Sequence, residues 1–152
     1  MHRIRQAKSE EAAVLTDIAV RSEAYWGYDP EFMESFRRAY KLTESFINEN
    51  PVYVIEEQGK ILGFYGIVPE KAVTELEYFY VGPEYIGKGL GKLLWTHLVG
   101  YCKENRIAGI SLVTSPQAVG FYTKLGAEQV GEIESLVRKG RMVPKLVCDF
   151  QQ

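Results

Sequence analysis

The sequence contains few of the residues that metal sites, disulfides and membrane spans need. Its two cysteines, Cys102 and Cys148, stand far apart, and only two histidines occur among 152 residues. This usage gives no C-x-x-C pair and no metal-ligand spacing, so we expect reduced thiols, no metal and a cytoplasmic protein. No apolar run approaches the ~20 residues that span a bilayer. The charged start of the chain, residues 1–5, lacks the apolar region of a signal peptide.

The chain also lacks a strong excess of either charge. Lys and Arg number 18 against 20 Asp and Glu, which gives a formal net charge of −2. We therefore expect neither a nucleic-acid nor a membrane partner. The length and the apolar fraction of 46% predict one globular domain over residues 1–152. Monomer and homodimer are both left open.

The order of the predicted elements indicates an α/β fold. Strands are expected near 2–6, 52–56, 61–68, 73–81, 107–114, 129–132 and 145–150. Helices are expected near 9–23 after a Ser9 cap, from Asp29-Pro30, and near 116–124, with a short piece capped by Thr43. A further helix follows residue 89, with one stripe formed by Leu90, Leu93, Leu94, His97, Leu98 and Tyr101. This order predicts one sheet with helices on both faces.

The most informative segment of the sequence runs from Val81 to Trp95. An apolar strand, 76–81, ends at Gly82-Pro83, glycines follow at 87, 89 and 91, and an amphipathic helix then begins. Free N–H groups and the positive end of the dipole at a helix start favour a phosphate, and missing Cβ atoms let it approach the backbone. The alternative is a tight strand–helix turn that binds nothing.

Two motifs in this order resemble those of the GCN5-related N-acetyltransferase (GNAT) superfamily. The stretch Ile86-Gly87-Lys88-Gly89-Leu90-Gly91 resembles motif A, of the form Arg/Gln-x-x-Gly-x-Gly/Ala. The stretch from Ser115 to Ala127 resembles motif B, Asn-x-x-Ala-x-x-Phe-Tyr-x-x-x-Gly-Phe. The resemblance covers essentially the whole chain. It implies the GNAT fold, a single mixed, mostly antiparallel sheet with helices on both faces, and acetyl-CoA as cosubstrate.

The resemblance also implies where acetyl-CoA binds. The pantetheine arm would pair with the backbone of Phe79, Tyr80 and Val81, and the pyrophosphate would lie on the turn formed by Gly87, Lys88, Gly89, Leu90, Gly91 and Lys92. Beside them it places Ser115, Gln117, Phe121 and Tyr122. Three positions depart from the motifs. Ile86 replaces Arg or Gln, which leaves Lys88 and Lys92 as the charges nearby, while Ser115 replaces Asn and Ala127 replaces Phe.

The match to motif B implies that Tyr122 is the general acid for the departing thiolate. A phenol near its ordinary pKa of ~10 is protonated at neutral pH and can donate to sulfur. The alternative is that Tyr122 only packs beside Phe121.

Two glutamates are candidates for the base that deprotonates the amine. Glu75 and Glu77 lie two apart on a strand and are expected to share one face with Phe79 and Val81. Glu77 is nearer the acetyl end of the strand, whereas alignment with distant members of the family favours Glu75. The alternative is a pair of carboxylates at the wet end of the strand or in salt bridges.

Aromatic residues between the first two predicted helices are candidates for the acceptor pocket. Tyr25, Trp26 and Tyr28 surround Gly27, and aromatic rings can stack on a planar group or surround a cation. Arg21 and Glu23 flank this loop, where they could orient a charged acceptor. The alternative is that the rings cover the edge of the core. His97, on the apolar stripe of its helix, is expected to be a packed residue.

Together these features predict an acetyl-CoA-dependent N-acetyltransferase. The acetyl group would pass to a primary amine by direct attack, without an acyl-enzyme, and the acceptor itself is not encoded in any motif. One alternative is an acyl-CoA-binding sensor that keeps the fold without catalysis, a reading that Ile86 favours. Another is a protein that binds a different nucleotide phosphate.

Overall fold

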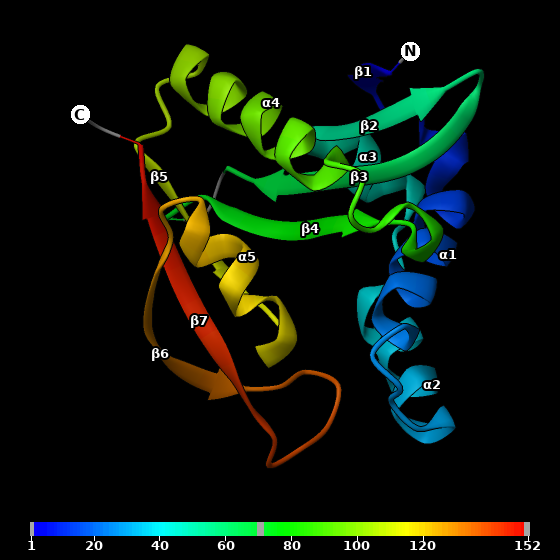
Figure 1. Ribbon diagram of the computed structural model, residues 1–152, viewed down its shortest axis with the longest axis vertical. Coiled ribbons are helices and arrows are strands. Elements are labelled where there is room, and N and C mark those ends of the chain that lie inside the picture. The colour runs from blue at the N-terminus through cyan, green and yellow to red at the C-terminus, as the bar shows by residue number, and fades with distance from the viewer. Residues whose placement is uncertain (1, 70–71, 151–152) are drawn as a thin grey trace.

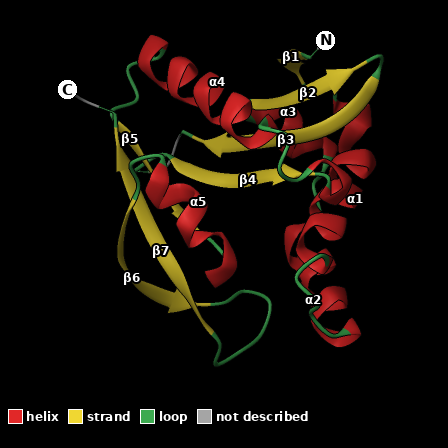
Figure 2. Ribbon diagram, in the orientation of Figure 1, coloured by secondary structure: helices red, strands yellow, loops and turns green. Residues whose placement is uncertain are grey.

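The computed structural model describes residues 2–69 and 72–150. These residues form one seven-stranded sheet with helices on both faces (Figures 1 and 2). The strand order is β1-β2-β3-β4-β5-β7-β6, and neighbouring strands are antiparallel except for β4 with β5. The expected mixed, mostly antiparallel sheet is therefore confirmed.

The strands follow the predicted segments closely. They are β1 (Arg3–Gln6), β2 (Val52–Glu57), β3 (Lys60–Val68), β4 (Glu75–Val81), β5 (Gly109–Val113), β6 (Glu128–Glu134) and β7 (Met142–Asp149). The helices are α1 (Ala12–Ala24), α2 (Pro30–Tyr40), α3 (Glu44–Glu49), α4 (Leu90–Glu104) and α5 (Val119–Lys124). Single 3₁₀ turns precede α1, α4 and α5 at Ser9–Glu11, Pro83–Tyr85 and Pro116–Ala118.

Several local signals in the sequence act as predicted. The Asp29 carboxylate accepts the Phe32 amide at 2.7 Å and so caps α2, and the Thr43 hydroxyl caps α3 from the same position. Gln58 and Gly59 both have positive φ, 52° and 79°, as a two-residue hairpin turn requires. These caps and this turn fix where the elements begin and reverse.

Two local expectations are wrong. Ser9 does not cap α1, because the chain first makes a 3₁₀ turn and the Glu11 carboxylate accepts the Lys8 amide there at 2.8 Å. Leu93 does not belong to the buried stripe of α4 and is 46% exposed. Trp95 and Cys102 are buried in its place, since the helix presents a face rotated slightly from the predicted one.

The helices on the two faces of the sheet cover two separate cores. On one face, α1, α2 and α3 bury Leu15, Ile18, Phe32, Phe36 and Ile47 against the strands. On the other face, α4 and α5 bury Leu90, Leu94, Trp95, Leu98 and Tyr122. A strand covered on both sides needs apolar residues on both faces, which explains why the buried part of β3 is a nearly continuous apolar run.

A bulge in β4 corrects the expected placement of Glu75. Gly66 pairs with Tyr78 and Ile67 with Leu76, so Glu77 is the extra residue. The bulge shifts the alternation by one, and Leu76 belongs to the α4 core whereas Tyr78 belongs to the α1 core. Glu75, which precedes the bulge, therefore lies on the face of Tyr78 and not on the face of Phe79 and Val81.

The parallel strands β4 and β5 diverge soon after they meet. Among the described residues their ladder has one residue pair, Glu75 with Ser111, supported by a bond from the Ser111 amide to the Thr74 carbonyl at 2.9 Å. Beyond it, β5, β7 and β6 turn away from β2, β3 and β4 (Figure 1). The side of β4 that faces β5 is thus left open over most of its length.

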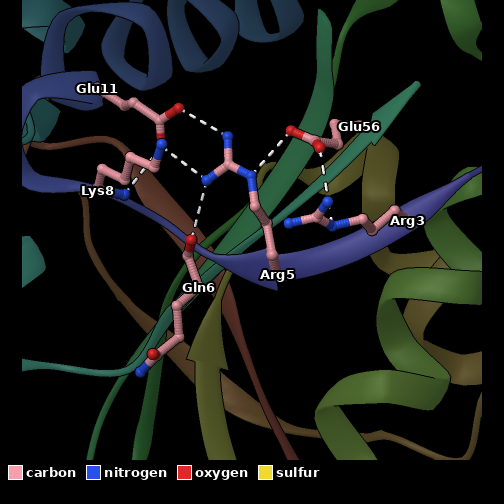
Figure 3. A network of polar contacts seen from close by, with 6 residues as sticks. All are labelled: Arg3, Arg5, Gln6, Lys8, Glu11 and Glu56. Atoms are coloured by element: carbon pink, nitrogen blue, oxygen red, sulfur yellow. Dashed lines mark hydrogen bonds and ion pairs between the residues drawn. The ribbon is translucent and has the colours of Figure 1, made fainter. Parts of the chain in front are cut away.

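Arg5 ties the edge strand β1 to its surroundings (Figure 3). Its guanidinium donates to Glu56 on β2 at 2.8 Å and to Glu11 before α1 at 2.7 Å. A further bond reaches the Gln6 carbonyl at 2.9 Å. The Arg5 side chain is 17% exposed, so these charge-assisted bonds are shielded from much of the screening that weakens surface pairs.

We expect Arg5→Gln to lower the free energy of unfolding at about pH 7 by about 2 kcal/mol, because two carboxylates lose a charged donor. The hydrogen bond from Arg5 holds the pKa of Glu11 below its ordinary value. The contribution is therefore present at neutral pH and is lost as the pH falls through that lowered pKa. Urea denaturation at about pH 7 and about pH 3 measures both effects.

The matched control is Arg38→Gln, which breaks the exposed Arg38–Glu34 pair within α2. This change should cost less than about 0.5 kcal/mol. Equal losses in the two variants would show that the Arg5 network adds nothing beyond a surface pair.

Candidate active site

A cavity of about 670 Å³ lies where β4 and β5 diverge. Its wall comes from the ends of α1 and α2, from β4, from the start of α4, from the segment between β5 and α5, and from the β6–β7 loop. Figure 1 shows α1 and α2 on one side of this region and α5 with β7 on the other. The volume is typical of pockets that bind small molecules.

The cavity brings together most of the residues that the sequence singled out. From β4 it is lined by Glu75, Glu77, Phe79, Tyr80 and Val81. The turn and the start of α4 contribute Gly87, Gly89, Leu90, Gly91 and Lys92, and the far wall contributes Ser115, Gln117, Phe121 and Tyr122. Trp26 also lines it. Lys88, Tyr25 and Tyr28 do not belong to the lining.

The glycine turn has the backbone that its sequence predicts. Gly87 and Gly89 have φ of +85° and +81°, which residues with a Cβ rarely adopt, and a Cβ on either would meet no protein atom within 4 Å. Gly91 is needed for another reason, since a Cβ there would lie 3.1 Å from the Phe121 ring. Helix α4, of 15 residues, begins at Leu90, so the free amides of its first turn lie at the cavity wall.

Positive charge at this end of the cavity comes from one of the two predicted lysines. Lys92 lines the cavity, whereas Lys88 stands over the Tyr85 ring at 5.9 Å and borders a separate hollow. Ile86 also lines the cavity and is 46% exposed. The departure at this position thus places an apolar side chain where the motif has a cation or an amide.

Tyr122 both packs in the core and reaches the cavity. Its ring contacts Phe79, Trp95 and Phe121 at centroid distances of 6.0, 5.9 and 5.2 Å. The side chain is buried, and burial first, then the charge of Glu23, raises the pKa of its hydroxyl. The phenol therefore stays protonated throughout the neutral range and is available as a proton donor.

From the sequence, Glu23 was expected only to flank the predicted acceptor loop, but in the structure it is a main residue of this cavity. It is only 7% exposed, lies near the end of α1 and lines the cavity. The signal was available: Glu23 follows the buried Ala12, Thr16 and Ala19 at helical spacing, so it belongs to the inward face of α1. A carboxylate on a buried face is costly unless it has partners or a function.

The surroundings of Glu23 include one hydrogen bond and one nearby cation. The Ser115 hydroxyl donates to Glu23 Oε2 at 2.7 Å. Burial raises the pKa of Glu23, while the Ser115 bond and then the charge of Arg141 lower it. Ser115, expected to contact the cofactor, is therefore oriented toward α1.

The β6–β7 loop is joined to the loop between α1 and α2. Arg138 donates to both oxygens of Asp29 at 3.1 and 3.0 Å. Arg141 donates to the Tyr28 hydroxyl at 2.9 Å, which in turn donates to Gln117 Oε1 at 3.0 Å. Tyr28 is thus a link between the two walls, although it does not line the cavity.

The other two aromatic residues of the predicted acceptor loop are largely exposed. Tyr25 is 55% exposed and Trp26 43%, and their rings meet edge to face at 5.2 Å. Of the two, only Trp26 lines the cavity. His97 Nδ1 and the Tyr65 hydroxyl share a hydrogen bond of 2.8 Å. This contact confirms that His97 is a packed residue.

The structure also bears on metals, thiols and membranes. Within residues 2–69 and 72–150, no three His, Cys, Asp or Glu side chains gather as a metal site would require. Cys102 and Cys148 are free and buried, and burial raises the pKa of Cys102 to about 11. No helix in the described part of the chain is long and apolar enough to cross a bilayer.

Comparison with known proteins identifies the family. The Acetyltransferase (GNAT) family matches residues 8–127. This chain belongs to the GNAT family. A curated relative, the 5-NmdU N-acetyltransferase of Pseudomonas phage PaMx11, is 28% identical over 131 residues, covering 85% of this chain and 89% of the relative. A peptidyl-lysine N-acetyltransferase of Salmonella typhimurium is 28% identical over 140 residues, covering 88% of each chain.

Solved structures agree on the GNAT fold. The PaiA N-acetyltransferase of Thermoplasma acidophilum, determined in complex with coenzyme A, superimposes with a TM-score of 0.81 at 21% identity, covering 98% of this chain and 99% of that one. The GNAT match ends at Ala127. It therefore includes the glycine turn, Glu23 and Tyr122, and leaves β6, β7 and their loop outside.

We expect Glu23→Gln to leave the free energy of unfolding at about pH 7 unchanged or to raise it by less than about 1 kcal/mol. Glutamine can still accept the Ser115 hydroxyl, and it removes a charge that burial disfavours. Because the folded-state pKa of Glu23 is raised, the parent should gain stability relative to the variant as the pH falls from that pKa toward the unfolded value.

Urea denaturation of parent and variant between about pH 4 and pH 8 tests this expectation. A loss larger than about 1 kcal/mol at neutral pH would show that Glu23 holds the fold together as an ionised group.

Proposed function

We propose that this protein transfers the acetyl group of acetyl-CoA to a primary amine by direct attack of that amine on the thioester. The observation that carries the proposal is the composition of one cavity wall. The open side of β4, the glycine turn at the start of α4 and the Tyr122 phenol border the same 670 Å³ space. Membership of the GNAT family and the coenzyme A complex of a fold neighbour support this function.

The residues of the turn fit the phosphates of coenzyme A. Gly87 and Gly89 line the cavity with positive φ, and a Cβ on either would meet no protein atom within 4 Å. The first-turn amides of α4 and the Lys92 ammonium supply donors and charge for an anion. The pantetheine amides would pair with the open edge of β4, where β5 has diverged. The backbone groups there belong to Phe79, Tyr80 and Val81.

Direct transfer needs an acid for the thiolate and a base for the amine. In this proposal Tyr122 is the acid, since its buried phenol is protonated at neutral pH and borders the cavity. Glu77 and Glu75 are the sequence-based candidates for the base, and both line the cavity. The bulge makes Glu77 the extra residue of β4, whereas Glu75 pairs with Val68 and Ser111, so the two glutamates differ in position.

The curated relatives are named for chemically different acceptors, 5-NmdU and peptidyl lysine. The acceptor of this protein therefore has to be inferred from its own cavity, and we propose the part lined by Trp26 and Glu23 as the acceptor side. We also propose a cytoplasmic location, for which the two free thiols are the supporting observation.

We expect acetyl-CoA to stabilise the parent by ~2.7 kcal/mol at a hundred times its Kd, and Gly89→Val to abolish most of this gain. Valine at φ +81° strains the backbone, and its branched side chain would occupy the open space beside Gly89 in which we propose the phosphates bind. Thermal unfolding and calorimetric titration with acetyl-CoA measure stability and affinity separately.

The matched control is Gly59→Val in the β2–β3 hairpin. Gly59 has nearly the same φ, +79°, and equally open space, but lies outside the cavity lining. Its variant should lose similar stability and bind acetyl-CoA like the parent. No melting shift of the parent with acetyl-CoA would overturn the proposed function.

We expect Tyr122→Phe to lower kcat by ~10²-fold or more with any accepted amine, the scale of one general-acid contribution, and to leave acetyl-CoA affinity nearly unchanged. Phenylalanine keeps the ring contacts and removes the proton. Steady-state kinetics and calorimetry give the two quantities. Parental kcat in this variant would exclude Tyr122 as the acid, and tight acetyl-CoA binding with no amine ever acetylated would favour a sensor.

A further inference from the structure

Four polar groups from four elements open onto the acceptor side of the cavity. They are the Glu23 carboxylate of α1, the Tyr40 phenol of α2, the Tyr80 phenol of β4 and the Tyr122 phenol of α5. Burial raises the pKa of all three phenols, and the charge of Glu23 raises it further, at Tyr40 after that of Glu77. Glu23 is thus a carboxylate that shares the cavity with these three hydroxyls.

One oxygen of Glu23 remains available inside the cavity. Oε2 accepts the Ser115 hydroxyl, and Oε1 accepts no hydrogen bond from the described residues. No fully buried side-chain oxygen or nitrogen in the described part of the chain lacks a partner. Oε1 is therefore still reachable from the cavity, and the same reasoning applies to the Tyr122 hydroxyl.

From this geometry, and resting on the proposed acetyl transfer, we propose that Glu23 binds the acceptor as an ammonium ion and takes its proton. Its acceptor would be a primary amine that is cationic in water. Ser115 and Arg141 act as positioning residues, which hold the carboxylate and favour its ionised form. This assignment differs from the sequence-based choice of Glu77 or Glu75.

The reaction balances with these two side chains. Glu23 Oε1 takes one proton from the ammonium, and the freed electron pair of nitrogen forms the new bond to the thioester carbon. As the carbon–sulfur bond breaks, Tyr122 gives its proton to sulfur and takes the proton that the acylated nitrogen loses. The products are the amide, the thiol of coenzyme A, an unchanged Tyr122 and one proton on Glu23 that passes to water.

The position of Glu23 relative to Tyr122 favours it over the two glutamates of β4. Among the described carboxylates, Glu23 is the one whose charge raises the pKa of Tyr122. Glu77 and Glu75 act instead on Tyr40, and Glu77 also on Tyr78. A base and an acid that serve one acyl transfer have to reach the same carbon, and Glu23 and Tyr122 line the same cavity.

The charges that face Glu23 predict how its ionisation can be tuned. Arg141 lies near enough to lower its pKa, yet no ion pair joins the two among the described residues. Arg141 is instead directed to the Tyr28 hydroxyl and lies over the Tyr28 ring at 5.3 Å. Removing the Arg141 charge or the Ser115 hydroxyl should therefore raise the pKa of Glu23, since each favours the carboxylate.

The test is the dependence of kcat/KM on pH for the full chain. A panel of four acceptors, namely spermidine, tyramine, an N-terminal alanine peptide and a lysine peptide, first identifies an acetylated amine. The profile is then measured with that amine for the parent and for Glu23→Gln, Glu75→Gln and Glu77→Gln. Glu34→Gln on the exposed surface of α2 is the control for a change of net charge.

We expect kcat/KM of the parent to rise with pH as Glu23 ionises. In Glu23→Gln this rising limb of the pH profile should be lost, and the plateau value of kcat/KM should fall by ~10²- to 10⁴-fold. Acetyl-CoA affinity should be unchanged. Glu75→Gln and Glu77→Gln should keep the limb. Loss of the limb in either of those variants, or its retention in Glu23→Gln, would overturn the assignment, whereas failure of the parent to acetylate any amine would instead overturn the proposed function.

The positioning residues provide a second test. If Ser115 and Arg141 had a purely structural role, their substitution would not shift the pH at which kcat/KM rises. Ser115→Ala and Arg141→Gln should shift the limb to higher pH, while Ser115→Thr and Arg141→Lys, which keep the hydroxyl and the charge, should leave it in place. In ¹³C-Glu-labelled protein, the carboxyl resonance absent from Glu23→Gln should titrate at the same pH as the limb. An unshifted limb and resonance in Ser115→Ala and Arg141→Gln would contradict the assigned roles.

Discussion

The bulge at Glu77 is the constraint on which the cavity depends. A bulge bends its strand and increases the local twist, and this one follows directly after the pair of Glu75 and Ser111 that joins β4 to β5. The strands separate from that point, so the sheet splits into a part led by β4 and a part led by β5. The opening exposes backbone groups of β4 that a longer parallel ladder would have used. It also lets side chains from both helical layers reach one space, which an unbroken sheet would keep apart.

The loops on the far side of the opening are joined by side-chain hydrogen bonds rather than by a backbone ladder. Arg138 with Asp29, and Arg141 with Tyr28, join the β6–β7 loop to the loop between α1 and α2. Asp29 also caps α2, so one carboxylate both starts a helix and receives the neighbouring loop. One side of the cavity is therefore bordered by two loops that are connected to each other, while another side is bordered by the start of a long helix. Exposed contacts of this type are individually weak.

How much could be predicted from the sequence follows from how local each signal is. Neighbouring residues set the local features that the sequence predicts correctly. These are the Asp29 cap, the Gln58-Gly59 turn and the glycines before α4. The bulge has no such local signal, because the register of β4 is set by its partner strand, and the expected common face of Glu75 with Phe79 and Val81 was therefore wrong. The loop contacts join residues more than a hundred positions apart, beyond the reach of any periodicity. Glu23 lies between these cases, since the helical spacing from Ala12 and Ala19 showed its inward face, but only the tertiary structure shows what lies there.

Ser115 illustrates how a departure from a motif acquires meaning from its contacts. Read from the sequence, a serine in place of asparagine looks like a weakened contact to the cofactor. In the structure its hydroxyl is 2.7 Å from the Glu23 carboxylate, which joins the wall beyond β5 to the end of α1. A buried carboxylate with a single hydrogen bond and no ion pair among the described residues is a costly arrangement, and a fold under selection for stability alone would replace it with an apolar side chain. Its place in a cavity beside a buried phenol gives that cost a physical reason: a carboxylate that water solvates poorly has a raised pKa and accepts a proton from an ammonium ion more readily than an exposed one does.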